Sequence, residues 1–375
     1  MIILKQKRKF LFSVFLANST LAFAGAMGGA QDLTHGFFVM GAPIYGSLSD
    51  EGINKTLFAD TFSANGDIEG HQISLDSRWG FLVGAGYKLN ADNDITLTYT
   101  NLKSKGFNDI DNTGPNGVLA NRLSQIVQND QNFIINNPVT NISFNGQQMI
   151  DASASVSSHY DFQTVELLTH HYFQNSFLSH VRFSRFYGIK ATEFKKGFSA
   201  EYAGSWALFD FNAFPPETVL VPLEDEIDYA AKFFGIGPQI GMGATWSLNR
   251  YISIVGDVSA AALGGSYSSS WDEDLNTSRA IPNIPVTPAN DHYGYNQSTP
   301  TTLWTSVVLG SNLAVAAQIP FSNGSSFGVQ GGINTEQYWS QVNADAIRSS
   351  ITKNNVYFAQ RFAVRDVFIK LSYTC

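Results

Sequence analysis

The chain has 375 residues and a formal net charge of −8, and 14% of its residues are charged while 13% are aromatic. Soluble domains carry about 25% charged residues, so the composition is unusual for one, and an acidic chain lacks the basic footprint of a nucleic-acid-binding protein. The single cysteine, Cys375, excludes an intramolecular disulfide framework and any cysteine-based zinc or iron–sulfur site.

The N-terminus has the three parts of a secretory signal peptide. Four basic residues precede an apolar stretch at residues 10–16, and an A-x-A cleavage site ends at Ala24. The apolar stretch is too short for a spanning helix, which needs about 20 residues. We therefore expect a signal peptide at residues 1–24 and a single domain at residues 25–375, whose net charge is −12 without the four bases.

The mature part contains stretches in which apolar residues occupy every second position. The clearest covers residues 229–263, where apolar side chains alternate with glycine and small polar residues. Successive side chains of a strand point to opposite faces, so this pattern is typical of a wall with lipid on one side and a lumen on the other. No apolar run after the signal peptide is long enough for a spanning helix, which leaves a closed barrel as the way to cross a membrane.

In chain order, the alternating stretches predict about ten strands. They cover residues 36–45, 79–89, 95–100, 159–172, 177–189, 229–246, 251–263, 302–319, 325–339 and 356–375. Tight turns alternate with longer loops, of which the principal ones are residues 46–78, 101–157, 190–227 and 264–301, with a short helix expected at 118–126. Bacterial outer-membrane barrels have an even number of strands, short periplasmic turns and long outer loops. We therefore expect an all-β fold, a transmembrane antiparallel up-and-down β-barrel of about ten strands within a range of 8–14.

The last expected strand carries a second signal. Apolar Val367, Ile369, Leu371 and Tyr373 alternate with polar neighbours up to the C-terminal Cys375. This pattern resembles the C-terminal signal by which outer-membrane barrels are inserted, although that signal usually ends in an aromatic residue. We expect the barrel-assembly machinery to be a partner of this strand, and the protein to reside in the outer membrane of a Gram-negative cell.

Four short motifs occur in a fixed order along the chain. They are AGAMG at residues 24–28, GFFV at 36–39, GIGP at 235–238 followed by Gly241, and GDVSAAAL at 256–263. Together they resemble the Legionella-type major outer membrane protein family, which is described as pore-forming. The resemblance implies an outer-membrane pore. Better-known members are rich in cysteine and cross-linked, whereas this chain has one cysteine, so the resemblance does not extend to disulfide-linked assembly.

The alternation also assigns charged side chains to the inner face of the barrel. Facing lipid, a lysine or arginine would cost about 2–4 kcal/mol at the midplane, so such groups are expected inside. The pore-lining candidates are Lys88, Glu166, His170, Arg182, Asp257, Glu336, Asp366 and Lys370. Two interpretations stay open: the charges pair and plug the barrel, or they line an aqueous path and set its ion preference.

Two other classes of function remain as alternatives. An outer-membrane protease would need an acid and a histidine above the membrane, for which Asp291-His292 and the acidic run at residues 272–274 are candidates. A non-conducting barrel would display its loops for adhesion or host interaction. The histidines lack metal-site spacing, and the Asp-rich turn at residues 109–114 lacks the glutamate of a calcium loop.

We therefore predict a narrow, weakly selective diffusion channel for small hydrophilic solutes or ions, without enzyme activity, cofactor or metal. Its expected partners are the lipid bilayer, the assembly machinery and small solutes. The sequence leaves the choice between a monomer and a homo-oligomer open.

Overall fold

A computed structural model describes most of the chain from Gly36 onward. The described residues are 36–50, 57–62, 67–111, 113, 118–121, 123–124, 148–174, 178, 180–210, 217–277, 292–321, 325–340 and 361–375. The signal peptide expected at residues 1–24 lies outside them. Within this part of the chain, no helix is long and apolar enough to cross a membrane.

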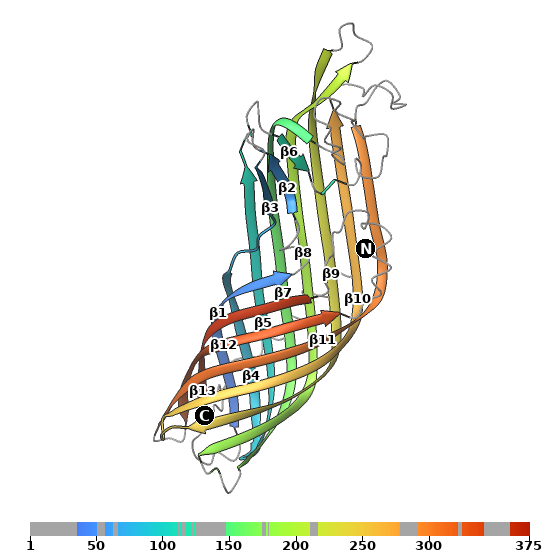
Figure 1. Ribbon diagram of the computed structural model, residues 1–375. Helices are drawn as coiled ribbons and strands as arrows, with labels where there is room; N and C mark the ends of the chain where they lie inside the picture. The colour runs from blue at the N-terminus through green and yellow to red at the C-terminus, as the bar shows by residue number, and fades with distance from the viewer. Residues whose placement is uncertain are drawn as a thin grey trace.

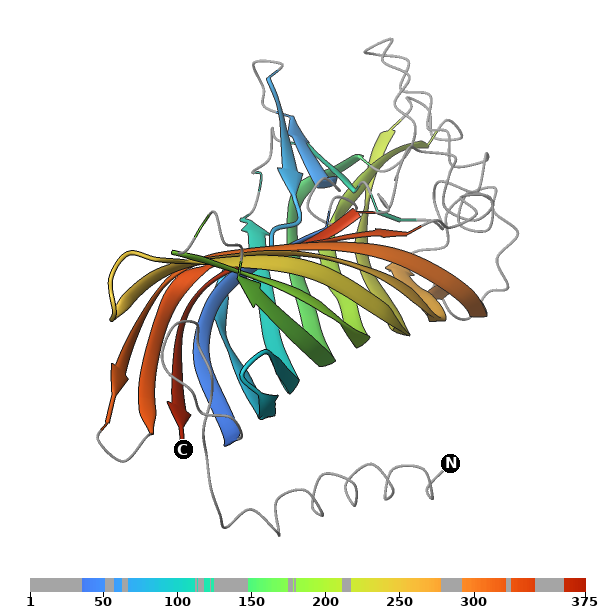
Figure 2. The same ribbon diagram turned by 90° about the horizontal axis from the view of Figure 1, so that it is seen from below.

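The described residues form thirteen strands in one antiparallel sheet (Figure 1). The strands are β1 (Gly36–Asp50), β2 (Leu57–Phe62), β3 (Ile68–Gln72), β4 (Arg78–Asn90), β5 (Asn93–Ile110), β6 (Val118–Asn121), β7 (Gln148–Gln174), β8 (Val181–Asp210), β9 (Glu217–Ser247), β10 (Ile252–Thr277), β11 (His292–Pro320), β12 (Ser326–Ser340) and β13 (Arg361–Thr374). All except β2, β3 and β6 close into a ring of ten, in which each strand pairs with the next in chain order and β13 pairs with β1. Figure 2 shows these strands side by side along the curved wall. The predicted antiparallel β-barrel of about ten strands is confirmed.

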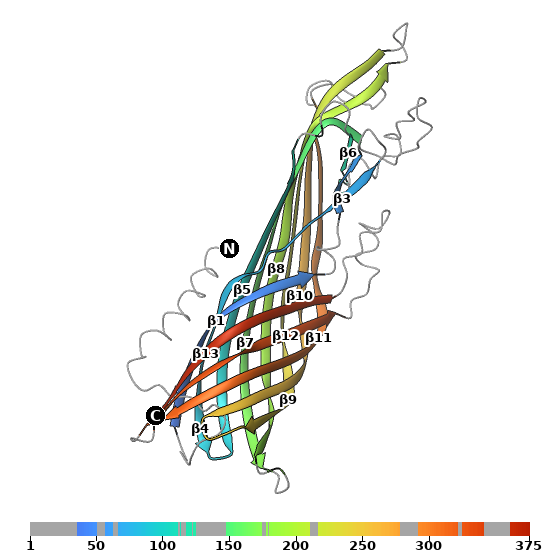
Figure 3. The same cartoon turned by 60° about the vertical axis from the view of Figure 1, so that its left-hand side comes forward.

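The wall of the ring is much taller on one side than on the other. Strands β8 to β11 have 26 to 31 residues, whereas β1, β12 and β13 have 14 or 15. Figures 1 and 3 show the long strands rising well beyond the short ones. The short strand β6 pairs with the start of β7, beyond the last residues of β5. Strand β2 pairs with β6, and β3 pairs with β2.

Large parts of the expected outer loops are therefore strands. The loop expected at residues 190–227 contains the second half of β8 and the start of β9, and the loop expected at 264–301 is largely β10 and β11. The helix expected at 118–126 is wrong in its described part, because Val118–Asn121 is strand β6. The cause is a change of pattern: above the membrane the outer face of a strand is polar, so the alternation no longer looks like that of a lipid-facing wall.

Strand β9 shows where the membrane begins. Its outward side chains include Glu224, Glu226 and Asp228 in the upper part and then become apolar from Phe234 down to Trp246. The apolar outward side chains remain 46% to 66% exposed on the protein surface. A continuous exposed apolar band of this kind on a closed barrel is the surface that faces lipid. The long strands thus cross the membrane near the tight turns, and their remaining length projects outside.

The change from acidic to apolar outward side chains on β9 predicts that a charge added to the outer face destabilises the barrel more at membrane level than above it. Ile240 lies in the middle of the apolar stretch of β9, and Ala230 is exposed on the same face above it. We expect Ile240→Arg to reduce the free energy of unfolding by about 2–4 kcal/mol, because it places a charge in hydrocarbon. Ala230→Arg, the matched control, should change it by about 0.5 kcal/mol or less. Denaturant titration in lipid vesicles measures both, and equal effects at the two positions would contradict the boundary.

Candidate functional site in the barrel lumen

The membrane-level lumen contains a polar cavity of about 290 Å³. Of the eight predicted pore-lining residues, six line this cavity, and they come from four different strands. The six are Glu166, His170, Asp257, Glu336, Asp366 and Lys370. Because the side chains of distant strands converge here, the cavity is the place where the barrel could bind or pass a solute.

The other two candidates, Lys88 and Arg182, do not line the cavity. The Arg182 guanidinium donates a hydrogen bond of 2.5 Å to the carbonyl oxygen of Ala91 and lies 4.6 Å from the centre of the Tyr172 ring. It therefore fastens the tight turn between β4 and β5 to the β7 and β8 hairpin. Lys88 lies on β4, opposite Asp94 of β5.

An acid–histidine contact that the sequence did not reveal lies near the tight turns. One oxygen of the Asp94 carboxylate is 2.8 Å from Nδ1 of His170, and the other accepts a hydrogen bond of 2.9 Å from the Tyr172 hydroxyl. Asp94 is buried. Asp94 was not among the predicted site residues because it directly follows a tight turn, and an aspartate at a turn is usually solvated.

The acid and histidine proposed for a protease lie elsewhere. Asp291 is outside the described residues, and His292 begins β11, where it pairs with Asn276 of β10. Residues 272–274 also belong to β10 rather than to a loop, and Glu273 points inward and is buried while Asp272 is exposed.

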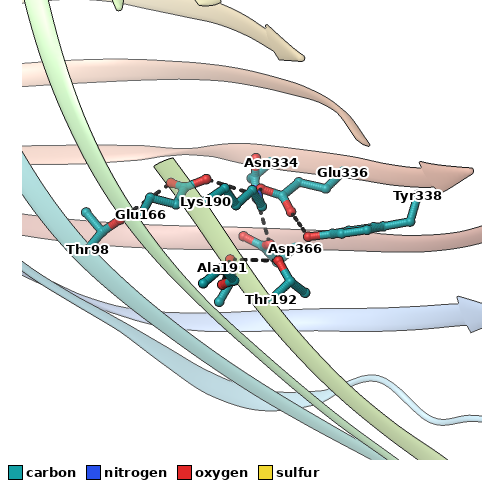
Figure 4. A network of polar contacts seen from close by, with 10 residues as sticks. Thr98, Glu166, Lys190, Ala191, Thr192, Asn334, Glu336, Tyr338 and Asp366 are labelled. Carbon is teal, nitrogen blue, oxygen red and sulfur yellow. Dashed lines mark hydrogen bonds and ion pairs between the residues drawn. The ribbon is translucent and has the colours of Figure 1, made fainter. Parts of the chain in front are cut away.

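The centre of the lumen is crossed by an ion-pair bridge on Lys190. Its ammonium group lies 2.9 Å from Oε1 of Glu166 and 2.7 Å from Oε1 of Glu336, and its side chain is only 1% exposed. Glu166 is on the neighbouring strand β7, but Glu336 is on β12, which pairs with neither β7 nor β8. Figure 4 shows the three side chains meeting between the walls. The bridge therefore spans the lumen rather than running along one wall.

The remaining carboxylate oxygens of the bridge are also hydrogen-bonded. Oε2 of Glu336 accepts a bond of 2.6 Å from the Tyr338 hydroxyl, and Oε2 of Glu166 accepts one of 3.4 Å from Thr98. Buried charges are tolerated when they are paired and hydrogen-bonded in this way. The network thus stabilises charged groups in a part of the lumen that is almost inaccessible to solvent.

Two other inward carboxylates are held by asparagine side chains. The Asn312 amide donates a bond of 3.0 Å to Asp257, and the Asn334 amide donates one of 3.2 Å to Asp366. Both pairs join neighbouring strands and border the cavity. Each of these carboxylates thus has a hydrogen-bonded amide partner on the next strand.

A layer of aromatic rings lies on the outer side of the bridge. Phe362 of β13 is its centre: the ring stacks on Tyr160 of β7 at 4.8 Å with an interplanar angle of 6°, and it lies 5.5 Å from Phe194 of β8. Phe162 and Tyr338 also contact it, at 5.8 and 5.3 Å. Because these rings come from opposite walls and are mostly buried, they close the lumen above the cavity.

The inward glycines of β9 do not leave open space. A Cβ atom on Gly241 would lie 2.1 Å from Cζ of Phe186, and one on Gly235 would lie 2.5 Å from Cζ of Phe233. These glycines accommodate aromatic rings instead. Among the described residues, the lumen therefore contains paired charges and packed aromatic rings.

A second buried cluster closes the projecting part of the barrel, above the membrane. Asn121 donates a hydrogen bond of 2.7 Å to Oδ2 of Asp225, and the hydroxyl of Ser124 bonds to Oε1 of Glu273. Trp271 donates to the other oxygen of Glu273 at 3.3 Å. Burial, together with the nearby carboxylate of Glu273, raises the pKa of Asp225 to about 8. The carboxylates fix the segment after β6 inside the mouth of the barrel.

Within the described ranges, no three His, Cys, Asp or Glu side chains form a group that could hold a metal ion.

Comparisons with known proteins identify the family of the chain. The family described as Legionella pneumophila major outer membrane protein precursor matches residues 48–375. No curated protein sequence matched. Two of the similar solved structures are the outer membrane protease OmpT from Escherichia coli (9% identity, 91% of this chain and 94% of that chain, TM-score 0.34) and the toluene transporter TbuX from Ralstonia pickettii (8% identity, 94% and 96%, TM-score 0.23). The chain is a β-barrel of a Gram-negative outer membrane, and it belongs to the Legionella pneumophila major outer membrane protein family.

Proposed function

We propose that the protein is a narrow diffusion channel for small hydrophilic ions, held closed in this conformation by the Lys190 bridge and the aromatic layer. The observation that carries the proposal is the polar cavity at membrane level, which is lined by charged groups from several strands. A barrel of about ten strands is close to the size at which side chains alone fill the interior. A small displacement of the closing side chains is therefore enough to make a narrow path.

The lining also supports a preference for cations. Among the charged residues that border the cavity, carboxylates outnumber basic groups. The carboxylates are Asp94, Glu166, Asp257, Glu336 and Asp366, and the basic side chains are Lys370 and His170. Rings of carboxylates favour cations in pores. Because both signs are present, we expect the selectivity to be weak.

Conductance in planar bilayers tests the proposal. We expect the refolded wild-type chain, residues 25–375, to show rare and small steps. Phe362→Ala, which removes the ring that contacts four other aromatic side chains, should make the steps frequent. Phe107→Ala, at an exposed ring on the outer face, is the matched control and should behave like wild type.

The reversal potential under a salt gradient tests the selectivity. In the Phe362→Ala background, Asp257→Asn combined with Asp366→Asn should reduce the preference for cations. A folded barrel that gives no steps, both as wild type and as Phe362→Ala, would contradict the channel.

The tall wall supports a second candidate function. The projecting parts of β7 to β11 enclose a hydrophobic core that includes Tyr202, Leu223, Ile227 and Leu275. A packed core above the membrane gives a rigid platform for surface loops, as a non-conducting barrel for adhesion would need. The absence of conductance steps in both bilayer experiments would favour the adhesion function. In neither proposal is the protein an enzyme, and in both the apolar outward face of β13 is the segment that the assembly machinery recognises.

A further inference from the structure

A row of charged side chains crosses four neighbouring strands on the outer face of the barrel. Lys103 of β5 lies opposite Asp161 of β7, which lies opposite Lys195 of β8, which in turn lies opposite Lys232 of β9. The three lysine side chains are 61%, 44% and 40% exposed. Lys105, two residues beyond Lys103, is exposed on the same face. Neighbouring strands are about 4.8 Å apart, so these amines form one compact surface patch.

The patch lies immediately above the apolar band. On β9, Phe234 and Ile236 follow Lys232 on the outward face toward the membrane, and on β8 Ile189 occupies the corresponding face. The row therefore stands at the level where the hydrocarbon of the outer leaflet gives way to its headgroups.

The charge of the patch contrasts with its surroundings. The four lysines face two carboxylates in the same area: Asp161 is 3.4 Å from Lys103, and Glu193 is 2.8 Å from Lys232 and 3.7 Å from Lys195. The patch is thus net positive on a chain whose net charge is −8. The carboxylates hold the lysine side chains in position without neutralising all of them.

We propose that Lys103, Lys105, Lys195 and Lys232 bind the phosphate groups of a phosphorylated glycolipid of the outer leaflet. The amines lie at the depth of the lipid phosphates, and the apolar side chains directly below them contact the acyl chains. Each lysine near an anionic membrane surface adds to the attraction for its lipids. A free phosphate would use the amines alone, whereas a lipid uses the amines and the apolar band together.

Retention of diphosphoryl lipid A tests the proposal. The refolded chain is placed in phosphatidylcholine nanodiscs that contain diphosphoryl lipid A, repurified in detergent and assayed for bound lipid. We expect Lys103→Gln/Lys195→Gln/Lys232→Gln to retain less lipid than wild type by roughly tenfold or more. The corresponding triple lysine-to-arginine variant keeps the charge and should retain the lipid.

Two controls separate the proposal from its alternatives. Arg78→Gln/Arg365→Gln removes exposed basic groups from β4 and β13, outside the patch, and should leave retention unchanged. Inorganic phosphate added during repurification should displace little lipid, because it lacks acyl chains. Equal retention by wild type and the glutamine variant, an equal loss in the control variant, or full displacement by inorganic phosphate would each overturn the proposal. A heat-modified gel band confirms that every variant is folded.

Discussion

Lys190→Met should lower the free energy of unfolding of the barrel by about 3–5 kcal/mol, because it leaves two buried carboxylates without their cation. The side chain of Lys190 is 1% exposed and lies within 3 Å of both Glu166 and Glu336. An unpaired buried carboxylate must either remain charged in a medium of low polarity or bind a proton, and both cost free energy.

Denaturant titration of the refolded chain in lipid vesicles measures this effect. Lys195→Met, on the same strand but exposed to solvent, is the matched control and should cost about 1 kcal/mol or less. The triple variant Lys190→Met/Glu166→Gln/Glu336→Gln removes all three charges and should regain most of the loss. A Lys190→Met variant as stable as the control would show that the bridge does not hold the walls together.

Raising the pH should open the segment after β6 at the mouth of the barrel. The pKa of Asp225 is about 8 in the folded protein, whereas that of an aspartate in water is about 3.9. Burial raises this pKa, so the closed mouth binds a proton that the open mouth releases. The stabilisation is complete below about pH 4 and is lost as the pH rises toward about 8, by at most about tenfold in the opening equilibrium per pH unit.

Hydrogen exchange of the described residues 118–121 and 123–124, read by mass spectrometry as protection factors, tests this expectation. Between about pH 5 and about pH 9, protection in the wild type should fall. Asp225→Asn cannot ionise and should flatten the dependence, while Asp228→Asn, an exposed outward residue on the same strand, should keep it. Constant protection in the wild type would contradict the assignment of a bound proton to Asp225 in the closed mouth.

The ten-stranded ring could be predicted because alternation is strong wherever a strand faces lipid. In β9, Phe234, Ile236 and Ile240 mark the outer face without ambiguity. The projecting parts were missed although the same alternation continues in Leu223 and Ile227, which point inward. There the outer face is acidic, so the pattern resembles an ordinary soluble strand, and prolines and polar residues nearby favoured a loop.

The candidate site was only half predictable, for a different reason. Parity along a strand decides which side chains point inward, and Glu166, Asp257 and Glu336 border the cavity. It does not decide which of them meet across the lumen, because that depends on the strand tilt and register of the closed ring. Lys190 was assigned to the start of a loop, so the cation that joins Glu166 to Glu336 was absent from the prediction.

The aromatic layer was missed for a related reason. Tyr160, Phe194 and Phe362 lie far apart in the sequence, and each could be an ordinary strand residue facing either side. Their stacking exists only once β7, β8 and β13 enclose the same lumen. The choice between paired charges and an aqueous path, which the sequence left open, therefore depended on contacts between opposite walls.

Thiol labelling from outside the cell tests the closed lumen most directly. In a Cys375→Ser background, Ser259→Cys places a thiol among the residues that line the cavity, and Ser270→Cys places one on the exposed outer face of the same strand above the membrane. Intact cells are treated with a small cationic methanethiosulfonate that does not cross membranes. We predict labelling at position 270 and none at position 259, with labelling at 259 appearing when Phe362→Ala is added. Rapid labelling at position 259 without that change would show a lumen open to the outside and would contradict the account.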